Sequence, residues 1–131
     1  MSRIVVTGGA GRLGRSLVAG LAAAGHELIS LDRTRAGALE LPGVEQVAVE
    51  LTDPDAASRA IAEAQADGLV HLAALAVPFS APEDVILRTN ATLALNVLSA
   101  GIAAGIPKLV AASSPTVLGY GAPSHSSGAM T

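Results

Sequence analysis

The sequence predicts an α/β protein built on a doubly wound parallel sheet of at least five strands. Apolar runs recur along the chain that are too continuous for a sheet with one wet face, and segments with helical spacing lie between these runs. Strands that are covered on both faces carry such runs, and their alternation with helices indicates right-handed βαβ units. We therefore expect a Rossmann-type sheet with the strand order 3-2-1-4-5.

The apolar runs give the positions of the strands. The expected strands are residues 4–6, 28–31, 47–49, 69–72 and 108–112. Between the first two, Leu13, Leu17 and Leu21 have helical spacing in a helix that ends at Gly25. These elements form the first βαβ unit.

Two further helices are expected after the third and fourth strands. Asp53 is a good N-cap and Pro54 suits the first helical position, so residues 55–66 are predicted to be helical. A third helix is expected at about residues 82–104. Each of these helices connects two parallel strands.

Composition and charge limit the function classes. The 131 residues make one domain, which we place at residues 1–121, with a Ser/Gly-rich loop or frayed end at 122–131 where the chain is expected to be incomplete. A net charge of −3 without a basic cluster argues against nucleic acid as a partner. The sequence has no cysteine and no N-terminal signal or membrane-spanning segment, so a soluble cytoplasmic protein without a membrane or thiolate metal site is expected.

The stretch VTGGAGRLG, residues 6–14, directly follows the first apolar run and opens the first helix. The start of a helix has unpaired N–H groups and a positive potential, so a pyrophosphate fits there. Glycines are needed because a Cβ would hold the phosphate away. The stretch can be parsed as Gly9-x-Gly11-x-x-Gly14 or as Thr7-Gly8-x-x-Gly11-x-x-Gly14, and either pattern alone is weak.

An acidic residue at the end of the second strand strengthens the dinucleotide hypothesis. Asp32 follows Gly14 by 18 residues, close to the offset at which an acid accepts hydrogen bonds from the adenosine ribose. Such a carboxylate repels a 2′-phosphate, which favours NAD, while Arg12, Arg33 and Arg35 leave NADP open. The alternative is a glycine-rich turn and a surface acid without a ligand.

Five motifs together resemble one family, the extended short-chain dehydrogenase/reductases of the NAD-dependent epimerase/dehydratase group. Residues 7–14 are similar to the TGxxGxxG fingerprint, 50–53 to DLTD, 71–74 to HLAA, Asn90 to the Asn that opens the NVxGT helix, and 113–119 to SSxxVYG. The resemblance covers nearly the whole chain. Within the family, the wording SSPTVLGYG is most similar to uronate dehydrogenases.

The resemblance implies a set of site residues. Those implied for the cofactor are Gly8, Gly11, Arg12, Leu13, Gly14, Asp32, Arg33, Glu50, Leu51, Leu72, Ala73, Ala74, Asn90 and Ser113. Ser114 matches the catalytic hydroxyl that steadies a developing carbonyl, and it is predicted at the carboxyl end of the fifth strand, where ligands of open α/β sheets bind. The alternative is that Ser113 and Ser114 only cap the strand end.

Three departures from the family pattern bear on activity. Glu50 replaces the adenine-contacting Asp, and Leu118 replaces the Tyr of SSxxVYG. The family's acid/base pair is Tyr-x-x-x-Lys, but Tyr120 is followed four residues later by Ser124, and no lysine follows Lys108. We therefore expect the 131-residue chain alone to be inactive.

Three functions stay open at this point. The favoured one is an NAD-dependent oxidoreductase or epimerase of a sugar, uronate or nucleotide-sugar, of which the chain is the nucleotide-binding portion. The others are a non-catalytic NAD(P) sensor of the same superfamily and a structural dimerisation unit. No metal site is expected, and His71 is interpreted as a core or strand-end histidine rather than an acid/base.

The third helix is predicted to be apolar on two sides. Ile86, Leu93 and Val97 share one face, whereas Leu95, Leu98 and Ile102 lie on the opposite one. One sheet covers only one face. In the family that the chain resembles, a helix at this place joins a two-fold four-helix interface, so a homodimer is expected; the alternative is that a further part of the same chain covers the second face.

Overall fold

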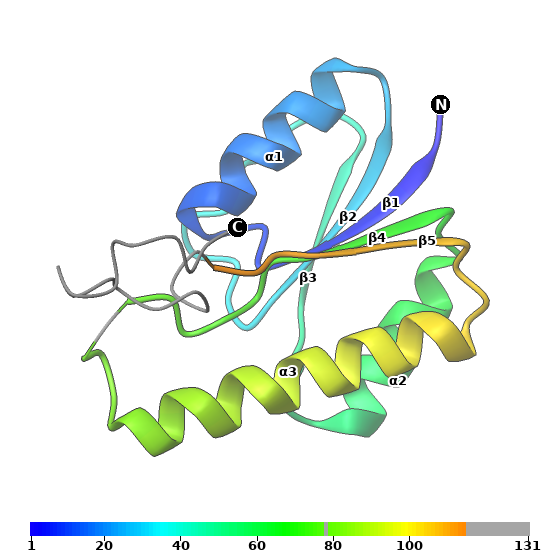
Figure 1. Cartoon of the computed structure of the whole chain (residues 1–131). Coiled ribbons are helices and arrows are strands. Elements are labelled where there is room, and N and C mark those ends of the chain that lie inside the picture. Colours follow the sequence, from blue (N-terminus) through cyan, green and yellow to red (C-terminus); the bar gives the residue numbers. More distant parts are fainter. Residues whose placement is uncertain (78, 115–131) are drawn as a thin grey trace, which may run out of the picture.

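The computed structural model describes residues 1–77 and 79–114. Its centre is a five-stranded sheet in which every neighbouring pair of strands is parallel (Figure 1). The strands are β1 (Arg3–Thr7), β2 (Glu27–Asp32), β3 (Val44–Ala48), β4 (Gly68–His71) and β5 (Lys108–Ala111). Their order in the sheet is β3-β2-β1-β4-β5, so the predicted strand order is confirmed.

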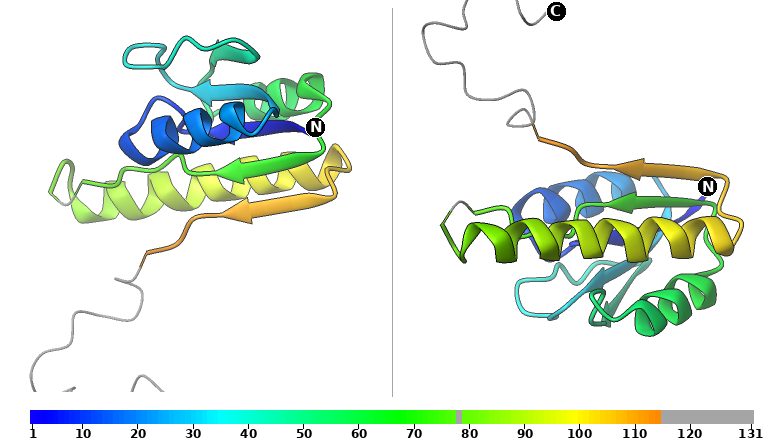
Figure 2. Two further views of the ribbon diagram at one scale, coloured as in Figure 1. Left: turned by 90° about the horizontal axis from the view of Figure 1, so that it is seen from above. Right: turned by 60° about the horizontal axis from the view of Figure 1, so that its bottom comes forward.

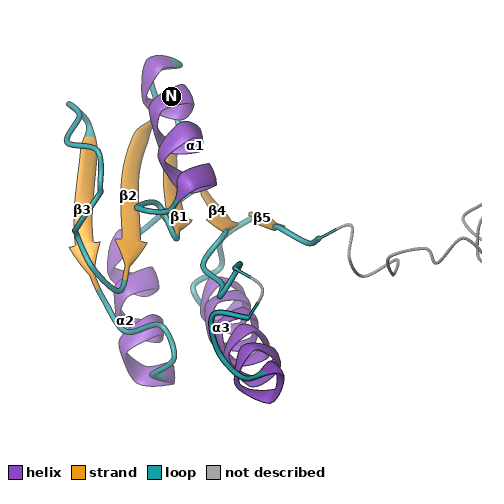
Figure 3. Cartoon of the chain, turned by 90° about the vertical axis from the view of Figure 1, so that its left-hand side faces the viewer, coloured by secondary structure: helices purple, strands orange, loops and turns teal. Residues whose placement is uncertain are grey.

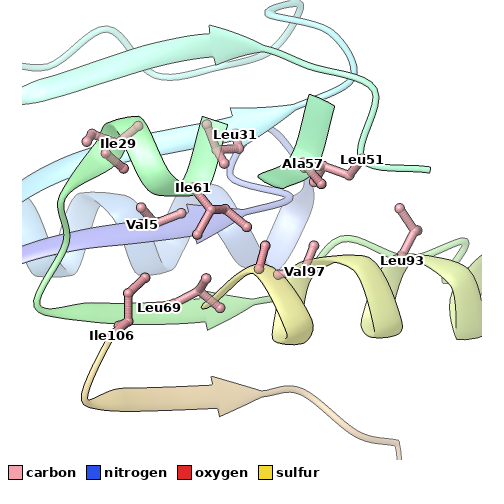
Figure 4. Packing of buried hydrophobic residues seen from close by; sticks show 12 residues of the cluster. Val5, Ile29, Leu31, Leu51, Ala57, Ile61, Leu69, Leu93, Val97 and Ile106 are labelled. Atoms are coloured by element: carbon pink, nitrogen blue, oxygen red, sulfur yellow. The ribbon is translucent and has the colours of Figure 1, made fainter. Parts of the chain in front are cut away.

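Helices cover both faces of the sheet. α1 (Arg12–Ala23) lies on one face, and α2 (Pro54–Ala64) and α3 (Glu83–Ala103) lie together on the other (Figure 3). The larger apolar cluster fills the α2 and α3 side and includes Val5, Ile61 and Val97, each of which is fully buried (Figure 4). A smaller cluster under α1 contains Val6 and Val18. The doubly wound architecture is therefore confirmed.

The two halves of the sheet are covered unequally on the α1 side. In the described part of the chain, α1 lies over β1 and β2, while no helix lies over β4 and β5 on that side (Figure 2). Val110 in β5 is 57% exposed in consequence. The fifth strand thus has an apolar side chain that faces solvent.

The predicted boundaries of the third strand were wrong. β3 begins at Val44 rather than at residue 47, and it pairs with β2 from Leu28↔Val44 to Asp32↔Ala48. Its first half contains Glu45, which is exposed, so this half has no apolar run. β3 is an edge strand of the described sheet, and backbone pairing rather than burial of both faces defines it.

The start of α2 agrees with the prediction and its end does not. Asp53 Oδ1 accepts hydrogen bonds from Asp55 N at 3.0 Å and from Ala56 N at 3.3 Å, which caps the helix. α2 ends at Ala64, two residues before the predicted end at residue 66, because Gln65 adopts a left-handed conformation with φ of 48°.

The two-sided character of α3 is confirmed, with one correction. Leu93 and Val97 are buried, whereas Leu95 and Ile102 are 67% and 70% exposed. Leu98 was placed on the exposed face, but it packs against the larger apolar cluster. By length and composition alone α3 also has the properties of a membrane-spanning helix, with a mean hydropathy of 1.3, which is weak evidence because its buried face packs in a core.

Candidate functional site

The turn between β1 and α1 is pressed against the carboxyl ends of the neighbouring strands. Gly8 N donates to Leu31 O of β2 at 2.8 Å, and Gly8 has a left-handed φ of 74°. A Cβ at this position would lie only 2.8 Å from the backbone nitrogen of Ala73, directly after β4. A side chain at position 8 is therefore excluded both by the backbone angle and by the close approach of β4.

The first turn of α1 packs equally closely on the glycine turn. A Cβ at Gly14 would overlap the carbonyl oxygen of Gly8 and would lie 2.8 Å from Gly9 Cα. Gly11 is the N-cap of α1, no side chain caps this helix, and its first turn contains no acidic residue. The amide groups of this turn and the positive end of the helix are thus available to an anion.

A buried hydroxyl lies beneath the glycine turn. Ser30 in β2 is 1% exposed, and its Oγ has no hydrogen-bond partner among the described residues. A Cβ at Gly9 would overlap this oxygen. Position 9 is therefore restricted to glycine by packing, although the fingerprint Thr7-Gly8-x-x-Gly11-x-x-Gly14 leaves it free.

The carboxylate of Asp32 reaches the glycine turn. Its Oδ2 accepts a hydrogen bond from Ala10 N at 3.1 Å, and its Oδ1 accepts one from Arg33 N at 2.7 Å. Each oxygen has a second lone pair for a ligand hydroxyl. Arg12, Arg33 and Arg35 are exposed, and of these the structure gives a contact with Asp32 only for the backbone of Arg33.

A side-chain contact that sequence reasoning missed joins β1 to β4. Thr7 Oγ1 lies 2.7 Å from His71 Nδ1, and it accepts hydrogen bonds from Leu72 N at 3.1 Å and Ala73 N at 3.2 Å. Thr7 is fully buried and His71 is 6% exposed, as expected for a core or strand-end histidine. Burial lowers the pKa of His71 below its ordinary value of 6.5.

Asn90 holds the loop that follows β4. Its Oδ1 accepts a hydrogen bond from Leu75 N at 2.7 Å, and its Nδ2 donates one to Leu75 O at 3.2 Å. The Asn90 side chain thus pairs with both backbone polar groups of Leu75. Asn90 lies well inside α3, which begins at Glu83, and does not open the helix. Its role in the described residues is to fix the β4–α3 connection.

The acidic side chain after β3 forms a hydrogen bond within its own turn. Glu50 Oε1 accepts a hydrogen bond from Thr52 Oγ1 at 2.7 Å, so the side chain folds back on its own turn. The side chain of Leu51 is 3% exposed and packs in the core, while its carbonyl oxygen accepts from Asn96 Nδ2 at 3.0 Å. Among the two, only Glu50 presents its side chain at the surface.

The two serines follow β5 at the same edge of the sheet. Ser113 and Ser114 are exposed, and the preceding Ala112 N donates to His71 O at 3.0 Å, so the ends of β4 and β5 stay together. Leu118, Tyr120, Ser124, His125 and the predicted segment 122–131 lie outside the described residues. Within the described ranges, no group of three or more His, Asp or Glu side chains is placed to hold a metal ion.

The site can be compared with known proteins once this geometry is established. The family model of the NAD dependent epimerase/dehydratase family matches residues 4–131. The chain belongs to this family. The resemblance inferred from the five motifs is therefore confirmed.

Relatives within the epimerase/dehydratase family carry out different reactions. The 2-alkyl-3-oxoalkanoate reductase of Stenotrophomonas maltophilia is 36% identical over 88% of this chain and 34% of that protein. The uronate dehydrogenase of Agrobacterium fabrum is 35% identical over 92% of this chain and 43% of that protein. The chain thus spans less than half of the length of these relatives.

A solved structure of the same family shows the same fold with a bound dinucleotide. The UDP-glucose 4-epimerase of Thermus thermophilus, solved in complex with NAD, superposes with a TM-score of 0.72. It is 34% identical, and the match covers 82% of this chain and 36% of that one. The described residues therefore correspond in fold to about a third of an NAD-binding epimerase.

Proposed function

We propose that this chain binds NAD at the glycine turn, as the nucleotide-binding portion of an oxidoreductase or epimerase that acts on a sugar, uronate or nucleotide-sugar. The observation that carries the proposal is the convergence of the uncapped first turn of α1 with Asp32, which is hydrogen-bonded to Ala10 N at 3.1 Å. An anion-binding helix end and a ribose-binding acid are thereby side by side.

The described residues fit a dinucleotide. Gly8 and Gly14 lack a Cβ, so Ala73 and the first turn of α1 can pack directly on the glycine turn. The uncapped amides at the start of α1 would then bind a pyrophosphate. Asp32 would bind the adenosine ribose, and the exposed Arg12, Leu13 and Arg33 would border the phosphates and the ribose. The other residues assigned to the cofactor are Gly11, Glu50, Leu51, Leu72, Ala73, Ala74, Asn90 and Ser113.

Of these residues, some would act directly and others through the backbone. Glu50 is exposed and would contact the adenine, while Leu51 would contribute only through its backbone because its side chain is in the core. Asn90 would act by holding Leu75 and not by contact. Leu72, Ala73 and Ala74 follow β4 beside Gly8 and would border the middle of the dinucleotide.

The proposed chemistry separates cofactor binding from proton transfer. Bound NAD supplies hydride acceptance from a carbinol carbon. Ser114 would donate a hydrogen bond to the oxygen on that carbon as the carbonyl develops, which is why we assign it to catalysis. The proton of the hydroxyl requires a base, and the 131 residues contain no Tyr-x-x-x-Lys pair.

Two measurements on the 131-residue chain test this proposal. Calorimetric titration should show NAD binding that is tighter than NADP binding, and Asp32→Ala should weaken NAD binding by about 1 to 3 kcal/mol, because hydrogen bonds to a charged acceptor are lost. Glu63→Ala, which removes an exposed carboxylate on α2 outside the glycine turn, serves as the control. Equal or tighter binding of NADP by the unmodified chain would contradict the assignment of NAD.

The second measurement concerns turnover. Absorbance of reduced nicotinamide, with sugars, uronates and nucleotide-sugars as substrates, should stay at background for the short chain. A longer chain that includes the family's Tyr-x-x-x-Lys should be active. Turnover by the short chain would show that its catalytic groups were misassigned, and Tyr120 would then be the first residue to change.

We also propose that the chain forms a homodimer through α3 and is cytoplasmic. The support for the dimer is the row formed by Leu87, Leu95 and Ile102, which are 71%, 67% and 70% exposed. Their spacings of eight and seven residues place them along one side of the helix, about two turns apart. Burial of such an apolar row against a second helix is more favourable than its exposure to water.

A further inference from the structure

The hydrogen-bond partners around the Thr7 hydroxyl determine the direction of its proton and the protonation of the His71 ring. A threonine hydroxyl donates once and accepts twice. Thr7 Oγ1 accepts from Ala73 N at 3.2 Å and from Leu72 N at 3.1 Å, an amide that it shares with Thr7 O at 3.1 Å. Both of these neighbours are donors, so neither can accept the hydroxyl proton. Its own proton must therefore point to the remaining neighbour, His71 Nδ1, at 2.7 Å.

This count determines the state of the histidine ring. Nδ1 accepts the hydrogen bond from the Thr7 hydroxyl, so it has no hydrogen of its own. The ring is therefore the neutral tautomer with its hydrogen on Nε2. A proton on Nδ1 would leave the hydroxyl proton of Thr7, which is fully buried, without an acceptor. Burial lowers the pKa of His71, which independently favours the neutral ring.

His71 lies at the junction of three elements of the site. Its ring holds the hydroxyl of Thr7, directly before the glycine turn, and its carbonyl accepts from Ala112 N at 3.0 Å, directly before Ser113. The amides that Thr7 binds in turn belong to the segment on which Gly8 packs, with Ala73 N 2.8 Å from the place of a Gly8 Cβ. The position of β4 against the glycine turn thus depends on where the Thr7 proton points.

We propose that His71 is a positioning residue for dinucleotide binding. By accepting a hydrogen bond from the Thr7 hydroxyl, it orients the lone pairs of that oxygen toward Leu72 N and Ala73 N. It thereby holds the ends of β4 and β5 against the glycine turn. This inference rests on the proposed binding of NAD. It assigns no contact between His71 and the dinucleotide. The histidine acts only through Thr7 and through its own backbone.

The test replaces the acceptor and the donor separately. His71→Leu removes the acceptor, whereas His71→Asn keeps an oxygen acceptor close to the position of Nδ1. Thr7→Val removes the hydroxyl at constant shape, whereas Thr7→Ser keeps it. His71→Leu and Thr7→Val should each raise the dissociation constant of NAD about fivefold to tenfold, the scale of one hydrogen bond, and the double variant should add little more. His71→Asn and Thr7→Ser should stay within about twofold of the unmodified chain.

A purely structural effect is excluded by a control and by a second readout. Ile61→Val removes a buried methylene on the α2 and α3 side of the sheet, opposite to α1, and should destabilise the fold without changing NAD affinity. Nitrogen NMR of the folded chain without NAD should show His71 protonated on Nε2 and not on Nδ1. A ring protonated on Nδ1 would overturn the proposal.

The affinity outcomes separate this proposal from the proposed function. If the unmodified chain binds no NAD, the proposed function is wrong, and the positioning role for a dinucleotide is overturned with it. If the unmodified chain binds NAD and both His71→Leu and Thr7→Val bind it equally well, only the positioning role is overturned. If the Asn variant fails to retain binding while the tautomer is as expected, hydrogen-bond acceptance by residue 71 is not the cause and the proposal is again wrong.

Discussion

The glycine turn and the outer face of α3 differ in how many of their groups have a partner within the described chain. At the glycine turn, Gly8 N, Ala10 N and Gly11 N each have a named acceptor within the chain. On the outer face of α3, Leu95 and Ile102 turn 67% and 70% of their surface to solvent. These three amides of the first region are paired within the described chain, whereas the second region has apolar surface that suits a partner or a further part of a polypeptide.

The largest effect is expected from a substitution at the glycine turn. Gly14→Ala places a Cβ against the carbonyl of Gly8, so the first turn of α1 must move away from the turn that it completes. We expect NAD binding to fall below detection and the free energy of unfolding to drop by about 3 kcal/mol, the upper scale for overpacking. Calorimetry and urea unfolding measure both.

A second glycine of the same helix provides the control. Gly20 is exposed in α1, and a Cβ there would meet nothing within 4 Å. Gly20→Ala should therefore stabilise the chain by about 0.5–1 kcal/mol and leave NAD affinity unchanged. If Gly14→Ala behaved like Gly20→Ala, the close packing of α1 on the glycine turn would not be what the site requires.

A smaller effect is expected on the exposed region. Leu95→Glu puts a charge in the middle of the proposed dimer face and should weaken self-association by at least about tenfold, because a carboxylate would be buried without a partner. Sedimentation of the two proteins measures it. Ala62→Glu on α2 adds the same charge at another exposed helical position and should not change the association state. A monomeric unmodified chain would contradict the proposed dimer.

The smallest effect concerns His71, which bonds to Thr7 directly before the glycine turn. Burial lowers the pKa of His71 in the folded chain, while in the unfolded chain it keeps its ordinary value of 6.5. Between these two pKa values the unfolded chain binds the proton and the folded chain does not. Stability from His71 is therefore complete above pH 6.5 and is lost as the pH falls through the lowered pKa.

Urea unfolding at pH 7.5 and at mildly acidic pH measures this dependence. His71→Asn has no titrating ring, so its stability should fall less on acidification than that of the unmodified chain. The other two histidines, His26 and His125, are present in both proteins and cancel in the difference. Equal losses in the two proteins would show that residue 71 does not carry this pH dependence.

Sequence reasoning predicted most of what depends on periodicity and on covalent geometry. The strand order, the Asp53 cap and the two-sided α3 all follow from patterns that local physics imposes. The start of β3 was missed because Glu45 interrupts the apolar run on an edge strand, where pairing with β2 replaces burial. Leu98 was misplaced because a helical projection gives the direction of each side chain but not how far around the helix the core extends.

The parts of the candidate site that follow from residue spacing along the sequence were predicted. The contacts between side chains of separate segments were missed. The glycine turn and Asp32 are visible in the sequence because their spacing is characteristic. The Thr7–His71 contact could have been found from the strand order, since β1 lies beside β4 and the two residues are paired in register. The orphan hydroxyl of Ser30 below Gly9 gave no sequence signal, because it depends on distances between side chain and backbone.

The pair formed by Gly9 and Ser30 has a consequence for how this sequence can change over generations. A residue with a Cβ at position 9 meets the Oγ of Ser30, and even without that oxygen its Cβ would lie 3.0 Å from the Cβ of residue 30. Replacement of Ser30 by alanine removes a hydroxyl that has no partner among the described residues and is therefore tolerated by itself. The reverse order, position 9 first, passes through an overpacked intermediate. A change away from glycine at position 9 thus meets less overlap after Ser30 has become alanine than before, which makes the two positions an epistatic pair.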